Sequence, residues 1–310
     1  MVREATFAAP VARPLLSRRA RELLTGYLYL LPVAIALGGT VLFPILKAMQ
    51  MSLYNHVLIK PQEYGFVGLA NYARLLHDDV FWLSLWNSFL WVFGSVTFQF
   101  LGGFAAALLL HQAFRGRSLV RTLTLLPWII PGVVVALIWE FIYQPNYGLL
   151  NDVLSRMGVM TERVAWLSSP VLAMPAVVLT NIWRGVPFFA IMLLAGLQAI
   201  PTELYEAARV DGASVTQRFW HITVPMLRPI IVVATATRIV WTFNYADLIF
   251  VMTSGGPANA TQITSTYTLM QAYSNLDFGY AATLSVVLLL IMLGFTIFYL
   301  RITRGLESTT

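Results

Sequence analysis

The residues of this chain that are best organised for chemistry form a short polar segment between two long apolar stretches. At fixed spacing it holds an acidic residue, two alanines, an aspartate, a glycine and an alanine, and then an isoleucine and a proline: Glu206, Ala207, Ala208, Asp211, Gly212, Ala213, Ile222 and Pro225. Two adjacent alanines let another helix or a groove approach closely. The chemistry that this pattern favours is therefore docking rather than catalysis.

Two short helices are expected to position these residues. The first is predicted to begin with Thr202 as its N-cap and to end at Gly212, because glycine adopts a left-handed cap at little cost. Ser214 and Gln217 have the spacing of a capping box, which predicts the start of a second helix, and Pro225 is expected to end it.

A second group of candidates consists of charged side chains in or beside apolar stretches: Lys47, Glu140, Arg184, Arg238 and Asp247. A charge at the centre of a bilayer costs about 2.5–3.5 kcal/mol, so such residues are expected to face other helices or a wet cavity. Lys47 and Glu140 lie near the ends of their stretches, where a charged side chain can reach the interface.

The segment around Arg238 is the most polar of the apolar stretches. On an ideal helix, Arg238, Trp241, Thr242 and Tyr245 share one face, whereas Asn244 and Asp247 fall on the other side, so Arg238 and Asp247 are not expected to pair. One polar face could line a path for a solute, or it could serve only helix–helix hydrogen bonding. The candidates for the path are Arg184, Arg238, Trp241, Thr242, Asn244, Tyr245 and Asp247.

Other kinds of site are not indicated. The sequence has no Gly-x-x-x-x-Gly-Lys-Ser/Thr phosphate loop, no cysteine, no metal-ligand spacing among its four histidines and no evident catalytic carboxylate pair or nucleophile. We therefore expect no enzymatic activity, metal or cofactor on this chain.

Composition places most of the chain in lipid. Apolar residues make up 58% of the 310 residues and charged residues 11%, with a mean hydropathy of +0.72. Soluble domains carry about 25% charged residues. The net charge of +6 does not indicate nucleic-acid binding, because the basic residues lie at the edges of apolar runs rather than in one patch.

Six membrane-spanning helices are predicted, each long enough for a hydrocarbon core of about 30 Å. The first is read as a retained span rather than a cleaved secretory signal. The spans cover about 27–53, 84–111, 119–143, 170–199, 226–252 and 278–300 within a membrane domain of residues 27–303. That domain includes the loop 200–225 and is flanked by tails of residues 1–26 and 304–310.

The basic residues predict the orientation of these spans. With the N-terminus inside, thirteen lysines and arginines fall on inner segments and four on outer ones. Both termini and the loop 200–225 are therefore expected in the cytoplasm.

The polar segment resembles the cytoplasmic signature of permease subunits in binding-protein-dependent ABC importers. That signature reads Glu-Ala-Ala, three residues, Gly, nine residues, Ile-x-Leu-Pro, and this chain departs from it only at Val224. Further stretches look like outer-loop features of the carbohydrate-type permeases, similar to those of maltose, trehalose and glycerol-phosphate importers: Phe66–Tyr72, Pro145–Asn151, Thr253–Pro257 and Asp277–Ala282.

The resemblance implies a six-span type I importer fold in a prokaryotic inner or plasma membrane, with the loop 200–225 acting as a coupling helix. It further implies a second homologous permease, two copies of a cytoplasmic ATPase that holds ATP and magnesium, and an external substrate-binding protein. The solute implied is a sugar or a related compound. The alternative from the residues alone is an ion- or proton-coupled secondary transporter, with Asp247 and Glu140 as relay groups.

Overall fold

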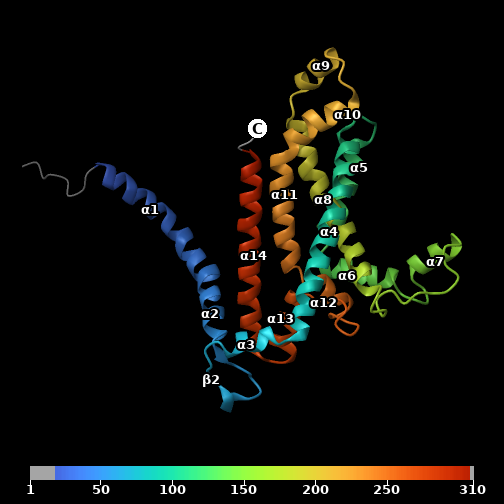
Figure 1. Ribbon diagram of the computed structural model, residues 1–310. Coiled ribbons are helices and arrows are strands. Elements are labelled where there is room, and N and C mark those ends of the chain that lie inside the picture. The colour runs from blue at the N-terminus through green and yellow to red at the C-terminus, as the bar shows by residue number, and fades with distance from the viewer. Residues whose placement is uncertain (1–17, 308–310) are drawn as a thin grey trace, which may run out of the picture. The chain divides into compact units, whose positions relative to one another are not determined.

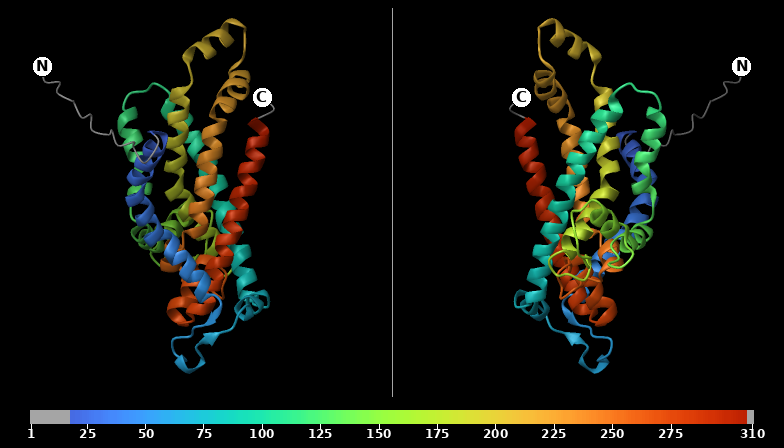
Figure 2. Two further views of the ribbon diagram at one scale, coloured as in Figure 1. Left: turned by 90° about the vertical axis from the view of Figure 1, so that its left-hand side faces the viewer. Right: turned by 90° about the vertical axis from the view of Figure 1, so that its right-hand side faces the viewer.

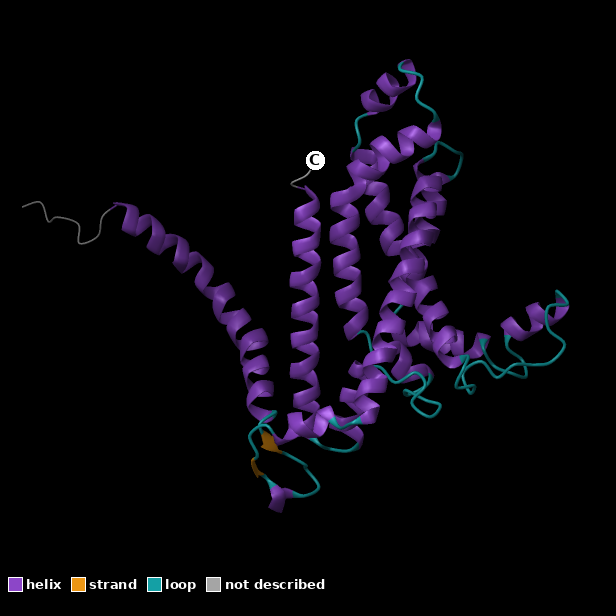
Figure 3. Cartoon of the chain, viewed as in Figure 1, coloured by secondary structure: helices purple, strands orange, loops and turns teal. Residues whose placement is uncertain are grey.

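The computed structural model describes residues 18–307, and they are mostly helical, with two strands of two residues each (Figure 3). Five helices in this part of the chain are long and apolar enough to cross a membrane, or six if one bent pair counts as a span. The five cover Thr25–Met51, Asp79–His111, Ala173–Ala199, Val215–Met252 and Phe278–Thr303. The all-α membrane fold is thus the one that the composition predicts. Residues 1–17 and 308–310 of the predicted tails lie outside the described residues.

The chain divides into two units, residues 1–50 and 51–310. In the first, α1 (Arg18–Leu37) continues through a π-helical segment (Gly38–Leu42) into α2 (Phe43–Met51). The helix therefore starts before the predicted span, within the expected tail. Lys47 donates a hydrogen bond from Nζ to Gln50 Oε1 at 3.0 Å, so its ammonium group has a polar partner on the same helix.

The second unit starts with β1 (Tyr54–Asn55), which pairs antiparallel with β2 (Gly65–Phe66). Its long helices are α4 (Asp79–His111), α8 (Ala173–Ala199), α11 (Val224–Asn244) and α14 (Phe278–Glu307). Its shorter helices are α3 (Ala70–Leu76), α5 (Arg117–Ile129), α6 (Gly132–Ile142), α7 (Leu149–Arg156), α9 (Thr202–Val210), α10 (Val215–Arg218), α12 (Asp247–Met252) and α13 (Thr264–Leu269).

The long helices of this unit run alongside one another and give it two distinct ends (Figures 1 and 2). At one end lie α9, α10, the loop between α4 and α5, and the C-terminal end of α14 (Figure 1). At the other end lie α3 and α13. The segments of this unit that the basic residues assign to the inside therefore share one end, and the membrane face that this end meets remains a prediction.

Glycines allow α4 and α8 to form the closest contact of the bundle. A Cβ added at Gly103 would overlap the Phe189 side chain and lie 2.9 Å from the Val186 carbonyl oxygen and 3.0 Å from the Ala190 nitrogen. Backbone atoms of a packed helix cannot move aside, so this position requires glycine. Small residues at a helix contact are the usual means by which helices associate in lipid.

The predicted span over 119–143 is not one straight helix. The axes of α5 and α6 differ by 94° across Ile130 and Pro131. Ile130 is extended, as expected for a residue that precedes proline, and Pro131 is the N-cap of α6. This bend lets the segment turn within the bundle instead of crossing it directly.

A partly buried carboxylate joins three helices at the end that holds α3. Asp78, the N-cap of α4, accepts hydrogen bonds from the Val80 amide at 2.9 Å, the Tyr267 hydroxyl at 2.6 Å and the Tyr280 hydroxyl. Burial acts to raise the pKa of Asp78, but these donors and the Phe81 amide together lower it below its usual value.

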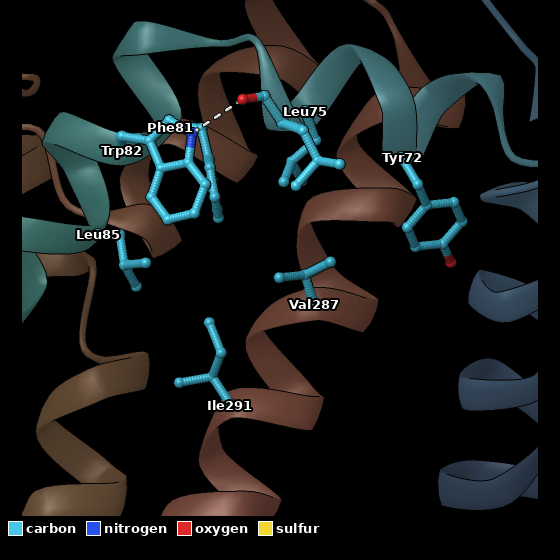
Figure 4. Close-up of a pocket in the computed structure, with 8 residues that line it drawn as sticks. Tyr72, Leu75, Phe81, Trp82, Leu85, Val287 and Ile291 are labelled. Atoms are coloured by element: carbon cyan, nitrogen blue, oxygen red, sulfur yellow. Dashed lines mark hydrogen bonds between the residues drawn. The ribbon is translucent and has the colours of Figure 1, made fainter.

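An apolar pocket of about 310 Å³ lies between α3, α4 and α14 (Figure 4). Trp82 stands at this pocket and donates a hydrogen bond from Nε1 to the Leu76 carbonyl at 3.1 Å. The lining residues are Tyr72, Leu75, Leu76, Phe81, Trp82, Leu85, Val287 and Ile291. A pocket of this composition can hold hydrocarbon chains, but it offers few hydrogen bonds to a hydrophilic solute.

Replacing Gly103 by alanine is expected to destabilise the protein by about 1–3 kcal/mol, because the added methyl group overpacks the α4–α8 contact. The melting temperature of the purified protein in detergent measures this effect. Gly94→Ala is the matched control, since its Cβ would meet Val178 at an ordinary 3.5 Å. Equal melting temperatures for the two variants would contradict the close contact.

Replacing Asp78 by asparagine is expected to lower stability by about 1–3 kcal/mol at neutral pH, because hydrogen bonds to a charged acceptor are lost. The lowered pKa means that this stabilisation is present above the pKa of the unfolded state, near 3.9, and is lost as the pH falls through the folded value. Melting curves of both proteins from neutral to acidic pH should therefore converge at the acidic end. A constant gap would show that the carboxylate charge is not what stabilises this cluster.

Candidate functional site

The helix that carries the Glu-Ala-Ala sequence projects from the end of the bundle that holds the C-terminal end of α14 (Figure 1). Thr202 is not its N-cap, as predicted, but its first residue. Pro201 occupies the cap position in an extended conformation, and no side chain caps the helix. Glu206, Ala207, Asp211 and Gly212 are exposed, and no ion pair involves Glu206 within residues 18–307.

The bend after α9 has the predicted geometry. Gly212 lies in the left-handed region at φ +77°, and the Ala213 amide donates to the Ala208 carbonyl at 2.8 Å. Ser214 and Gln217 form the predicted capping box, with their reciprocal hydrogen bonds at 3.3 and 2.8 Å. Glycine is needed here for its backbone conformation alone, since nothing lies within 4 Å of a Cβ at this position.

The prediction that Pro225 ends the second helix is wrong. The segment from α10 to α11 is continuous through a five-residue π-helix, Phe219–Thr223, and Pro225 lies in the first turn of α11. Proline is tolerated there because the wider π turn and a helix start do not require its missing N–H. The second short helix is therefore an extension of the fifth span.

We call α9, the bend at Gly212 and α10 with its π-helical extension the helix pair. A shallow groove of about 320 Å³ lies between α9 and this second helix. Ala208, Ala213 and Ile222 of the predicted set line it together with Gln217, Arg218 and His221, whereas Glu206 lies outside it. The Tyr205 hydroxyl and Thr223 Oγ1 are 2.9 Å apart, which joins α9 to the π-helical segment. Apolar side chains around the groove are exposed: Leu204, Val210, Val215 and Trp220. The surface therefore combines small, apolar and polar groups, many of which are exposed.

A second candidate site is an open cavity of about 330 Å³ bounded by α5, α8 and α11. It is lined by Trp128 of α5, Arg184 of α8, and Arg238, Trp241, Thr242, Asn244 and Tyr245 of α11 and its end. All the predicted path residues except Asp247 thus meet at one cavity. The expectation that Asn244 faces away was wrong, because Asn244 lies one helical turn after Trp241 and lines the same cavity. Asp247 is the exposed first residue of a separate helix, α12.

Arg238 is positioned by a hydrogen bond to Gln99, a residue that was not among the predicted candidates. Its Nε donates to Gln99 Oε1 at 2.7 Å, and Gln99 Nε2 donates in turn to the Asn181 carbonyl at 2.8 Å. Gly185 makes room for this contact, since a Cβ there would overlap both Gln99 and Arg238. The sequence could have indicated Gln99 as a candidate, because it is a polar side chain inside a long charge-free stretch.

Aromatic rings form much of the cavity wall. The guanidinium carbon of Arg184 lies 4.6 Å from the centre of the Tyr245 ring, and Phe188 packs against Trp241 at 5.6 Å. Trp128 also lines the cavity, and Trp91 is fully buried behind it, donating to the Thr242 carbonyl at 3.0 Å. Arginine, amide and aromatic groups around one cavity can bind a hydrophilic molecule that also has an apolar face.

Known proteins match this chain over most of its length. Residues 99–309 match the family described as binding-protein-dependent transport system inner membrane component. The trehalose/maltose transport system permease protein MalF of Thermococcus litoralis is 39% identical over 285 residues, or 92% of this chain and 95% of that protein. The sulfoquinovosyl glycerol transport system permease protein SmoG of Agrobacterium fabrum is 37% identical over 91% of each chain.

The fold is also similar to that of solved structures. A chain of a bacterial ABC transporter involved in the import of the acidic polysaccharide alginate matches with a TM-score of 0.79 and 25% identity, covering 92% of this chain and 96% of its own. The same transporter has been solved in complex with an alginate pentasaccharide-bound periplasmic protein. From its sequence match, its membrane helices and this likeness, the chain belongs to the inner-membrane permease components of binding-protein-dependent ABC transport systems.

Proposed function

We propose that this permease forms half of the pathway through which a sugar or a related solute enters the cell, and that its helix pair at Glu206–Pro225 docks onto a separate ATPase. The observation that carries the proposal is the exposed, internally capped helix pair with its left-handed bend at Gly212. Its geometry is fixed by contacts within the chain, while Glu206, Val210 and Val215 are left exposed.

The connections of the helix pair explain how docking could act on the pathway. α8 precedes α9 directly, and α10 continues into α11, so the two helices that carry Arg184 and Arg238 both begin or end at the docking surface. A displacement of this surface would move two walls of the cavity. ATP binding and hydrolysis on the partner would then switch the cavity between inward- and outward-open states, each favoured according to its ligands.

The partners that we propose follow from the same arrangement. A second homologous permease would supply the other half of the pathway, and two copies of an ATPase would hold ATP and magnesium below the membrane. A substrate-binding protein would deliver the solute from outside, as the alginate transporter's complex with a periplasmic protein suggests. The saccharide class rests on relatives named for trehalose, maltose and sulfoquinovosyl glycerol.

The alternative of an ion- or proton-coupled secondary transporter loses its support. Neither of its expected relay residues, Asp247 and Glu140, lines the cavity, and the chain belongs to a family of ABC transport components. Uptake by vesicles that contain the complete assembly tests the proposal directly. Uptake driven by ATP supports it, and uptake driven by a proton gradient alone refutes it.

Replacing Gly212 by valine is expected to lower ATP-driven uptake by about tenfold. A β-branched residue in the left-handed region costs about 1–2 kcal/mol, enough to shift the bend to another conformation in most molecules. Uptake per assembled complex in vesicles measures the effect.

Gly158→Val is the matched control for this substitution. Gly158 also has a positive φ, +71°, with nothing within 4 Å of its Cβ, but it lies after α7, far along the chain from the helix pair. The backbone strain is therefore similar in the two variants, and only its position in the structure differs. Normal uptake in the Gly212 variant, or equal loss in both, would refute the coupling role.

The orientation predicted from the basic residues can be tested with single cysteines, because the chain has none of its own. Cysteine at Ala260, in the loop between α12 and α13, is expected to react with a membrane-impermeant maleimide added outside intact cells. Cysteine at the exposed Thr216 should react only after the cells are opened. The reverse pattern would place the helix pair outside and exclude docking onto a cytoplasmic ATPase.

A further inference from the structure

Two guanidinium groups line the same intramembrane cavity without an acidic partner. Arg238 is only 4% exposed, and its one side-chain hydrogen bond goes from Nε to the neutral Gln99. Arg184 has a buried Nε with no hydrogen-bond partner. Within residues 18–307, no salt bridge is formed by either arginine, and no acidic residue lines the cavity.

The surroundings make these charges costly. An arginine within a membrane span carries a penalty of about 2.5–3.5 kcal/mol on insertion scales, and partners normally offset it. Here the neighbours are mostly aromatic: Arg184 lies over the Tyr245 ring, and Arg238 lies 5.8 Å from the centre of the Phe188 ring. The Tyr245 hydroxyl is also buried and unpaired. The cavity therefore offers several donors and lacks an acidic acceptor.

The position of Arg238 is fixed rather than accidental. Gln99 is itself anchored to the Asn181 carbonyl, and it bonds the arginine through Nε, which leaves Nη1 and Nη2 without an acceptor in the described part of the chain. The absence of a side chain at Gly185 permits this arrangement. A guanidinium group held in this way presents its fork to one direction, the geometry that binds carboxylate and phosphate oxygens in pairs.

We propose that this cavity recognises an anionic group on the transported solute, such as a carboxylate, sulfonate or phosphate ester, and hence that the solute class is an acidic saccharide. The inference rests on the proposed function of the cavity as part of the pathway. Arg184 and Arg238 bind the anion, while the rings of Trp241 and Tyr245 pack against the apolar face of the sugar ring. The cavity volume of about 330 Å³ falls within the range of small-molecule sites.

Binding of two matched probes to the complete co-purified assembly tests this inference. Methyl β-glucuronide and methyl β-glucoside share one ring and differ in a carboxylate against a hydroxymethyl group. In nanodiscs of phosphatidylcholine, calorimetric titration should give a dissociation constant at least about tenfold lower for the glucuronide, because a charge-assisted hydrogen bond contributes more than a neutral one. Added salt should weaken the binding of the glucuronide and leave the binding of the glucoside unchanged.

The variants identify the groups responsible. Arg184→Gln and Arg238→Gln should each reduce the preference about tenfold or remove it, whereas Arg238→Lys should retain part of it. Arg184→Gln leaves the Gln99 contact intact and so remains informative if the Arg238 variants fold poorly. Arg156→Gln is the charge control, because Arg156 is exposed on α7 and pairs with Asp152.

Three results would overturn the inference. They are equal binding of both probes, a preference for the glucuronide that persists in both glutamine variants, and no saturable binding of the glucuronide. The last result would mean that a carboxylate of the second permease already fills the site. Competition by phosphatidylglycerol in the nanodiscs would assign the site to a lipid headgroup and overturn it as well. ATP-driven uptake of a neutral saccharide only would refute this inference while keeping the proposed function, whereas uptake independent of ATP would refute the function itself.

Discussion

The contact between α4 and α8 is the constraint on which the rest of the structure depends. Gly103 brings the two backbones together, and Gly185 on the same helix pair leaves the space in which Gln99 meets Arg238 of α11. Three helices are therefore joined at one level of the bundle, by packing on one side and by hydrogen bonds on the other. Without that close approach, the Arg238 guanidinium would have neither its anchor nor its direction.

The docking surface and the cavity are two ends of the same elements. α8 carries Arg184 and leads into α9, while α10 and the π-helical segment lead into α11 and Arg238. The hydrogen bond between Tyr205 and Thr223 closes this arrangement on the side of the loop. Because both cavity walls are attached to one compact helix pair, a partner that binds the pair can act on both walls together.

The sequence predicted features that depend on local conformation. The left-handed bend at Gly212 and the capping box at Ser214 follow from residue type alone, and most of the cavity residues were found because charge and aromatic groups stand out in an apolar stretch. Features that depend on tertiary contacts or on the course of a helix were missed. An ideal helix assigned Asn244 to the wrong face, and the π turn before Pro225 has no sequence signal that we used. The hydrogen bond from Arg238 to Gln99 joins residues 139 positions apart, so no local pattern could predict it.

The uninterrupted helix through Pro225 has a mechanical consequence. Its α10, π-helical and α11 parts comprise 4, 5 and 21 residues, and α10 lies across the end of α11 rather than in line with it (Figures 1 and 3). At roughly 1.5 Å per residue, α11 alone is about 30 Å long, which matches the thickness of a hydrocarbon core. Had proline broken the helix, a flexible joint would separate α10 from α11. As built, the helical backbone runs through the corner without a break, so a displacement of α10 can be passed on to the cavity wall that carries Arg238.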